Sequence, residues 1–293
     1  GTIDYYVKET RDLLSVIPVA AGSNFTNQIL TNVGSIRNRG VEFVINAAAV
    51  QQKDFNLDLN FNITYNQNEI TNLTRVPDPN FQGVEIGGIS GGTGNTVQVH
   101  SVGFPTFSYY VYKQVYGTDG KPLEGVYVDL NKDGKITPDD RYRYKSPQPR
   151  VFLGFSPQAT YKQWNAGFVL RGSFGNYVYN NVFSNGGALQ DLYNSTGYLV
   201  NRSTNVLETG FQNKQLLSDY YIQNASFVRM DNINLGYNFG SVYKGLNVRA
   251  TASVQNAFVI TKYKGIDPEI ANGIDNNFYP RPRVYALGLT INY

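Results

Sequence analysis

Residues 55–66 alternate strictly between apolar and polar side chains. The two sets have opposite parity: Phe55, Leu57, Leu59, Phe61, Ile63 and Tyr65 against Asn56, Asp58, Asn60, Asn62, Thr64 and Asn66. Successive side chains of a β-strand point to opposite faces, so this segment has one apolar face and one amide-rich face. A strand that crosses a membrane needs roughly 9–11 residues, and this segment is long enough. The pattern therefore favours a membrane-spanning β-barrel.

The same alternation recurs at several places along the chain. Strands of membrane barrels show it because apolar side chains face lipid while polar side chains face the interior. We predict an all-β, antiparallel transmembrane barrel fold, with strands near 2–11, 37–50, 54–67, 149–161, 164–178, 226–239, 244–260 and 283–293. Half-buried strands of a soluble all-β protein alternate in the same way, so this alternative stays open on alternation alone.

The links between these strands differ in length in a regular order. Links of a few residues alternate with long connections at about 12–36, 68–148, 179–225 and 262–282. Outer-membrane barrels have short periplasmic turns and longer outer loops. The long connections are therefore predicted to be extracellular loops.

Composition agrees with a barrel and excludes several other classes. Charged residues make up 16% of the 293 residues, against roughly 25% in soluble domains. The 23 tyrosines and 17 phenylalanines suit aromatic girdles at the membrane interfaces. No apolar run approaches the roughly 18 residues of a membrane-spanning helix, which excludes a helical membrane protein. The net charge of +3 is too small to indicate nucleic-acid binding, and the absence of cysteine excludes disulfides.

One segment has the spacing of a calcium-binding loop. Oxygen-bearing side chains occupy positions 1, 3, 5 and 9, position 7 offers its backbone carbonyl, and a carboxylate closes position 12. The predicted metal ligands are Asp129, Asn131, Asp133, Lys135, Thr137 and Asp140. Gly134 stands at position 6, where the chain must turn sharply. We expect a structural Ca²⁺ ion here, although position 12 is usually Glu, and a polar turn without metal is the alternative.

Catalytic motifs are missing from the sequence. His100 is the sole histidine, and neither a nucleophile elbow nor a zinc-binding helix motif occurs. A carboxylate pair such as Asp139 and Asp140 is the sole feature that would suit a glycosidase, and nothing in the sequence indicates a cleft around it. We therefore expect no enzyme activity and no organic cofactor. The chain begins directly on a strand pattern, so we expect it to be part of a longer protein.

Four segments resemble a known family. They are NVGSIRNRGVEF at 32–43, the 129–140 loop, NAFVITKYKGIDPE at 256–269, and YPRPR at 279–283 with the final strand. Together they are similar to the C-terminal part of SusC/RagA-type TonB-dependent outer-membrane transporters of Bacteroidetes. The patterns N-x-G-x-x-x-N-x-G-V-E and K-Y-x-G-x-D-P-E carry most of this resemblance, which extends over essentially the whole chain.

This resemblance implies a fold and a function. Transporters of this kind are plugged barrels of about 22 strands, so residues 1–293 would be the C-terminal portion of the barrel domain, about its last eight strands, without the plug. The family imports oligosaccharides or peptides across the bacterial outer membrane with energy delivered through TonB. It works with a SusD-like surface lipoprotein that covers the barrel mouth. No nucleic-acid partner is implied.

The long loops would then frame the mouth of the barrel. Aromatic loop residues are candidates for stacking on substrate or on the partner lipoprotein: Phe104, Phe107, Tyr109, Tyr110, Phe278 and Tyr279. Packing within the loops is the alternative role for them. Two other functions remain open from the sequence, a calcium-stabilised soluble β-sandwich that binds glycans and a self-closed eight-stranded outer-membrane barrel.

Overall fold

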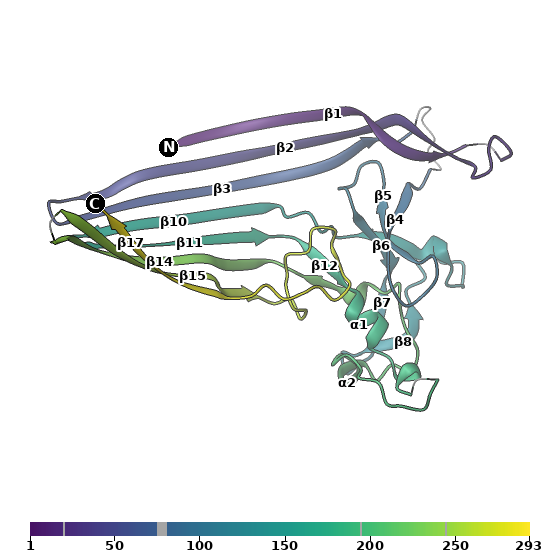
Figure 1. Ribbon diagram of the computed structural model, residues 1–293. Coiled ribbons are helices and arrows are strands. Elements are labelled where there is room, and N and C mark those ends of the chain that lie inside the picture. Colours follow the sequence, from purple (N-terminus) through teal and green to yellow (C-terminus); the bar gives the residue numbers. More distant parts are fainter. Residues whose placement is uncertain (20, 75–80, 194, 244) are drawn as a thin grey trace.

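The computed structural model describes residues 1–19, 21–74, 81–193, 195–243 and 245–293. Parts of three predicted loops, at 20, 75–80 and 194, and the first residue of the predicted strand 244–260 lie outside the described residues. The chain forms one layer of long strands with a group of shorter elements at one end (Figure 1).

The long strands form a single eight-stranded sheet in the order β1-β2-β3-β10-β11-β14-β15-β17. Every neighbouring pair in this sheet is antiparallel, which confirms the predicted all-β fold class. The strands span β1 Thr2–Pro18, β2 Gln28–Gln51, β3 Phe55–Asn72, β10 Val151–Tyr161, β11 Trp164–Phe174, β14 Phe227–Tyr243, β15 Leu246–Thr261 and β17 Val284–Asn292.

The strand register places like side chains side by side across the sheet. Asn60 of β3 pairs with Asn46 of β2 and with Ser156 of β10 on the polar face. The next residue, Phe61, pairs with Phe155 on the opposite, apolar face. Large side chains of the apolar face are exposed, up to 90% for Leu287 in β17. The alternation read from the sequence therefore separates two faces of one sheet.

The predicted connection over 12–36 is corrected by the structure. β1 continues to Pro18 and β2 already begins at Gln28, so most of this range is paired strand. The register shifts between Thr10 and Leu13, where Asp12 has a φ of 57°. Such a bulge moves the following residues to the other face, which breaks the alternation by which the strand was recognised.

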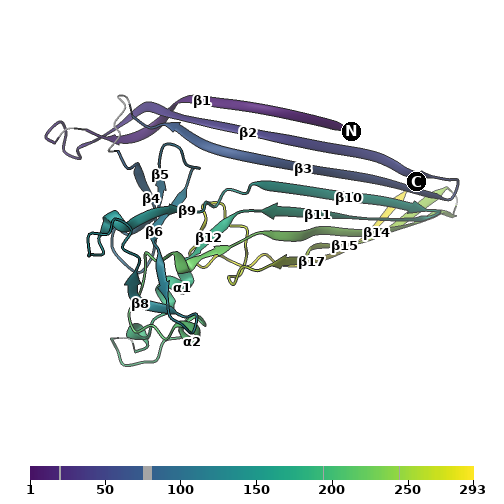
Figure 2. The same ribbon diagram turned by 180° about the vertical axis from the view of Figure 1, so that it is seen from behind.

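The long connections fold together at one end of the sheet, whereas the short turns gather at the other end (Figures 1 and 2). We call residues 81–148, 175–193, 195–225 and 262–282 the loop domain. Its strands are β4 Val84–Gly88, β5 Thr96–His100, β6 Ser108–Tyr112, β7 Gln114–Tyr116, β8 Pro122–Tyr127, β9 Arg141–Tyr144, β12 Tyr177–Asn180, β13 Ile222–Asn224 and β16 Ile274–Asp275. Its helices are α1 Asn181–Gly186 and α2 Val206–Thr209, with 3-10 turns at Pro138–Asp140, Leu189–Asp191 and Asp219–Tyr221. None of the described helices is long and apolar enough to span a bilayer.

The loop domain has a hydrophobic core to which all three connections contribute. Tyr109 and Val111 come from the first connection, Tyr179 from the second and Ile274 from the third. The buried hydroxyl of Tyr109 donates to the carbonyls of Tyr177 and Gly273, at 2.8 Å each, and so joins the same three segments. The long connections are thus one packed body.

The two alternative folds are wrong. β1 and β17 stand at the two ends of the eight-stranded sheet and are not paired with each other, so these strands do not close into a small barrel. A sandwich needs two sheets packed face to face, with the apolar sides of both buried between them. Here the apolar face of the long sheet is exposed, because the loop domain lies at the end of the strands.

Replacing Tyr109 with Phe tests the role of this hydroxyl. The variant removes the hydroxyl donor of the Tyr177 carbonyl, whereas the Gly273 carbonyl keeps the backbone N–H of Tyr179, and we expect a loss of about 1–3 kcal/mol of loop-domain stability. Amide hydrogen exchange should accelerate in β6, β12 and the 270–275 segment. Tyr116→Phe, at a half-exposed ring, is the control and should leave exchange unchanged. Equal exchange in both variants would show that the hydroxyl of Tyr109 does not hold these segments together.

Candidate functional site

The loop domain is bonded to the polar face of the sheet. Asn68 of β3 accepts a hydrogen bond from the backbone N–H of Thr106 at 2.9 Å and donates to Asn38 of β2 at 2.7 Å. Asn256 of β15 donates to the carbonyl of Arg281 at 3.0 Å. The polar face is therefore the side on which the connections fold back, and we call it the interior face.

A network of charged side chains holds the third connection against this interior face. Its members are Arg171, Arg229, Asp231, Asp267, Glu269 and Arg281. Arg171 of β11 contacts Asp231 at 2.9 Å and Glu269 at 2.7 Å. Arg229 of β14 contacts Asp267 at 2.7 Å, and Arg281 contacts both Asp267 and Glu269 at 3.0 Å. The network joins two strands to the 262–283 segment.

Two side chains of this network, Arg229 and Asp267, are buried. The side chain of Arg229 is 3% exposed and that of Asp267 is 10% exposed. Removing one partner of such a pair leaves a buried charge without compensation, which is costly. Asp267 and Glu269 belong to the K-Y-x-G-x-D-P-E pattern, but nothing in the sequence indicates that Arg171 and Arg229 contact them.

The charges around Glu269 set its protonation. Burial alone would raise the pKa of Glu269, but the hydrogen bond from Arg171 and the positive charges of Arg171, Arg281 and Arg229 outweigh it and lower the pKa. Because the pKa of Glu269 is lower in the folded than in the unfolded state, its ionised carboxylate stabilises the fold at a pH above the unfolded pKa of about 4.3. This stabilisation is lost as the pH falls through the folded-state pKa. Glu269 is therefore ionised at neutral pH.

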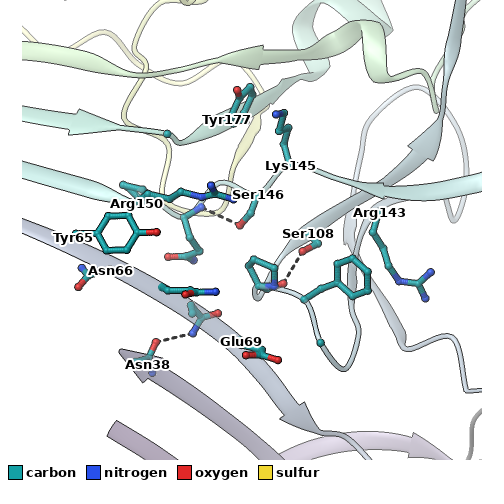
Figure 3. A pocket seen from close by; sticks show the side chains of 18 of the residues that line it. Asn38, Tyr65, Asn66, Glu69, Ser108, Arg143, Lys145, Ser146, Arg150 and Tyr177 are labelled. Atoms are coloured by element: carbon teal, nitrogen blue, oxygen red, sulfur yellow. Dashed lines mark hydrogen bonds between the residues drawn. The ribbon is translucent and has the colours of Figure 1, made fainter. Parts of the chain in front are cut away.

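A cavity of about 800 Å³ lies between β1–β3 and the loop domain. Its walls come from Tyr6 and Lys8 of β1, from β2 and β3, and from the segments 103–108, 143–152 and 175–177. Most of the lining is polar or charged, and Figure 3 shows Asn38, Asn66, Lys145, Ser146 and Arg150 around the same space. The sequence did not predict this cavity because its walls are distant in the chain.

A glycine shapes one wall of this cavity. A Cβ at Gly40 would stand 2.5 Å from the backbone carbonyl oxygen of Tyr65, and 2.8 Å from both the amide of Asn66 and the ring of Tyr6. The hydroxyl of Tyr6 donates to Asn66. Gly40 belongs to the N-x-G-V-E part of the sequence pattern, and close approach of a neighbouring backbone carbonyl and side chains explains why a glycine stands there.

The six aromatic residues proposed for stacking divide into two groups. Tyr109 is buried in the loop-domain core, and Tyr110 is 8% exposed with the guanidinium of Arg141 4.3 Å from its ring centre. The stacking prediction is wrong for these two residues, because they pack the domain.

The other four aromatic residues remain accessible to different degrees. Phe104 and Phe278 are partly exposed and Tyr279 is 95% exposed. Phe107 is half-buried against His100, with ring centres 4.8 Å apart. Phe104 lines the cavity, whereas Tyr279 and Phe278 belong to the third connection. For these residues, contact with substrate or partner stays a prediction.

The predicted calcium loop is ordered by its own backbone. Asp129 accepts from the N–H of Gly134 at 2.8 Å, and Gly134 has the positive φ that its position requires. Asp140 accepts from the N–H groups of Thr137 and Leu130 at 2.8 Å each. The hydrogen bond from Thr137, followed by those from 130–131 and a contact with Asp129, holds the pKa of Asp140 below its ordinary value.

Two further proposed ligands also accept hydrogen bonds from the backbone of this loop. Asn131 and Asp133 accept from the N–H groups of residues 133 and 135, at 3.0 Å and 2.8 Å. Within the described ranges, no group of three or more His, Cys, Asp or Glu side chains is arranged to hold a metal ion. A calcium site here would depend on amide, hydroxyl and carbonyl oxygens in addition to the carboxylates, and it stays a prediction.

Arg229→Met tests whether the charged network fixes the third connection. We expect a loss of about 3 kcal/mol, because Asp267 keeps Arg281 but loses its most buried partner. Proteolysis within 262–283 should become faster. Arg249→Met removes a single exposed contact to Asn165 and should cost only about 1 kcal/mol. Unchanged proteolysis of Arg229→Met would show that the connection is held by other contacts.

Comparison with known proteins identifies relatives of this chain. No family model matches it. The TonB-dependent receptor SusC of Bacteroides thetaiotaomicron is 44% identical over 302 residues, covering 100% of this chain and 30% of that protein. The TonB-dependent receptor P3 of Formosa agariphila is 28% identical over 327 residues, covering 100% of this chain and 32% of that protein. The chain therefore spans about a third of the length of these relatives.

Solved structures give the same result. The RagAB peptide importer in its "closed-closed" state matches with a TM-score of 0.76 and 26% identity, over 99% of this chain and 33% of that chain. Its "open-open" state matches with a TM-score of 0.76 and 26% identity, over 99% and 32%. The sequence and the fold of this chain are therefore those of the C-terminal part of a SusC/RagA-type TonB-dependent receptor.

Proposed function

We propose that this chain forms part of the wall and the outer loops of an importer in the bacterial outer membrane. The importer takes up nutrients, either oligosaccharides or peptides, with energy delivered through TonB. The separation of the long sheet into an exposed apolar face and a polar interior face carries this proposal, because it suits a wall between lipid and a water-filled lumen. The similarity to SusC over the whole chain supports it.

The interior face would serve passage of a polar solute. Its amides form hydrogen bonds with one another and with backbone carbonyls, such as that from Asn60 to the carbonyl of Ser156 at 3.2 Å. Groups of this kind exchange readily between protein, water and solute. The wall would therefore hold solute weakly enough to release it, and the chain contributes binding and passage instead of catalysis.

The loop domain would frame the outer mouth and meet a SusD-like surface lipoprotein. It lies at one end of the strands as a single packed body (Figure 1). Exposed aromatic residues on it, Phe278 and Tyr279, are available for contact with the lipoprotein or with solute. A rigid rim suits a surface on which a lid opens and closes.

Uptake by cells tests the proposed function. Deleting the gene for the full-length receptor, or blocking TonB, should abolish uptake of either labelled oligosaccharides or labelled peptides. Complementation with the intact gene should restore it. Uptake of both solute classes at the original rate in the deletion strain would contradict the proposal, as would a receptor that stays monodisperse without detergent or lipid.

A pair of substitutions tests which face meets lipid. Leu59→Arg places a charge on the apolar face and should destabilise the inserted receptor by about 2–4 kcal/mol near the middle of the bilayer. Asn60→Arg, the adjacent residue on the interior face, is the matched control and should have a mild effect. Unfolding by urea in lipid vesicles measures both. Equal effects would contradict the assignment of the faces.

The proposal includes a Ca²⁺ ion in the 129–140 loop, as a clamp on one part of the loop domain. The spacing of the oxygen-bearing residues along the loop supports this site. The ion would have a structural role, since the loop supplies its ligands from a single tight turn.

Limited proteolysis tests the calcium clamp. In the unmutated receptor, calcium should slow cleavage within 120–148 and a chelator should reverse this. Asp133→Ala removes one oxygen ligand and should abolish the calcium effect while the barrel stays folded. Asp119→Ala, an exposed carboxylate of the same segment outside the loop, should behave like the unmutated protein. Cleavage that calcium does not change in the unmutated receptor would remove the metal from the proposal.

A further inference from the structure

The cavity between β1–β3 and the loop domain has an excess of positive charge. Its lining includes four basic residues and a single acidic one: Lys8, Arg143, Lys145, Arg150 and Glu69. In the part of the chain that the structure describes, none of these five side chains takes part in a salt bridge. Elsewhere on the interior face the arginines of the charged network are paired, so the cavity differs from its surroundings.

Three of the four basic groups are exposed. The side chains of Lys8, Lys145 and Arg150 are exposed to solvent. Arg143 is instead engaged, since its guanidinium donates to the hydroxyl of Ser101 at 2.9 Å and to the side-chain carbonyl of Gln82 at 3.1 Å. Lys8, Lys145 and Arg150 are therefore the groups that a ligand in the cavity can reach.

These three residues come from different parts of the fold. Arg150 stands at the start of β10, where its backbone is bonded to Asn66 at 2.8 Å and to Phe174 at 2.9 Å. The ammonium of Lys145 lies 5.1 Å from the ring centre of Tyr177. Lys8 comes from β1, opposite Asn38. All three groups line the same cavity, so an anion bound there would be attracted by each of their positive charges.

The rest of the lining suits a polar solute with a body larger than a simple ion. Amides of Asn66 and Gln148 offer hydrogen bonds to neutral groups, and the rings of Phe152 and Tyr177 offer flat apolar surfaces. The volume of about 800 Å³ lies within the range of about 300–1,000 Å³ that is usual for small-molecule sites.

We propose that this cavity binds the carboxylate groups of an acidic solute, with Lys8, Lys145 and Arg150 as its charged ligands. The inference rests on the proposed import function and makes it more specific, because it assigns an anionic solute to this part of the wall. Charge-assisted hydrogen bonds to carboxylates are about twice as strong as neutral ones, so the cavity favours acidic over neutral solutes of the same size. Acidic peptides and acidic oligosaccharides share this chemistry.

Binding to the full-length receptor in detergent tests the inference, with two pairs of probes in isothermal titration calorimetry. One pair is a Glu-rich peptide and the Gln-rich peptide of the same length. The other is an oligogalacturonate and the neutral galactose oligomer of the same length. At least one acidic probe should bind more tightly than its neutral partner, and added salt should weaken that binding.

Charge removal identifies the residues. The triple variant Lys8→Gln, Lys145→Gln, Arg150→Gln should weaken binding of the acidic probe by about tenfold or more and leave the neutral probe unchanged. The matched control Lys53→Gln, Lys121→Gln, Arg283→Gln removes the same number of exposed charges outside the cavity and should bind as the unmutated receptor does. The probe pair that responds shows whether the acidic solute is a peptide or an oligosaccharide.

Two results would overturn the inference. One is that neither acidic probe binds more tightly than its neutral partner, which includes the case in which no probe binds. The other is that the cavity variant and the control variant bind the acidic probe equally. Either result leaves the proposed import function standing if TonB-dependent uptake of a neutral nutrient is observed. Failure of the proposed import function would instead appear as uptake that does not depend on the receptor at all.

Discussion

The two-sidedness of the long strands is the constraint on which the rest of the structure depends. In a sheet of this kind each strand satisfies its backbone through its neighbours, so the side chains alone decide what each face can contact. One face presents Leu287, Leu289 and Ile291 to the outside, and the other presents amides and hydroxyls. On the proposed membrane location, lipid covers the first face and water the second. The connections can then fold back only over the polar side, which is where they are bonded.

The connections are held together by hydrophobic packing and are attached to the sheet by polar contacts. The loop domain has its own hydrophobic core, which joins three segments far apart in the sequence through residues such as Tyr109 and Ile274. Its attachment to the sheet is polar, through Asn68 and through the charged network around Arg229. An apolar attachment would require an apolar patch on the interior face, which would interrupt a water-filled lumen. Buried ion pairs allow close contact without such a patch, although their net gain in stability is small.

The sequence predicted those features that depend on neighbouring residues along the chain. Alternation located the long strands, and its loss at the bulge near Asp12 hid the ends of β1 and β2. The patterns around Gly40 and Glu269 were recognised as a resemblance, yet their physical roles depend on Tyr6 and Arg171, which lie far away in the chain. The choice between stacking and packing for Tyr109 stayed open for the same reason, because an aromatic residue in a long polar connection has no local sign of a core. The cavity could not be predicted, since its walls come from separate segments.

The cavity and the docking of the loop domain depend on each other. Lys8 belongs to a long strand, whereas Lys145 belongs to the loop domain and Arg150 to the junction between the two. The spacing of these charges is therefore set by how firmly the loop domain is held against the sheet. The bond from Thr106 to Asn68 lies at this cavity, and the charged network holds another part of the same body. A loosened loop domain would move Lys145 away from Lys8 without changing either residue. The proposed selectivity for acidic solutes would thus depend on the tertiary arrangement, and substitutions far from the cavity would alter it by changing that arrangement.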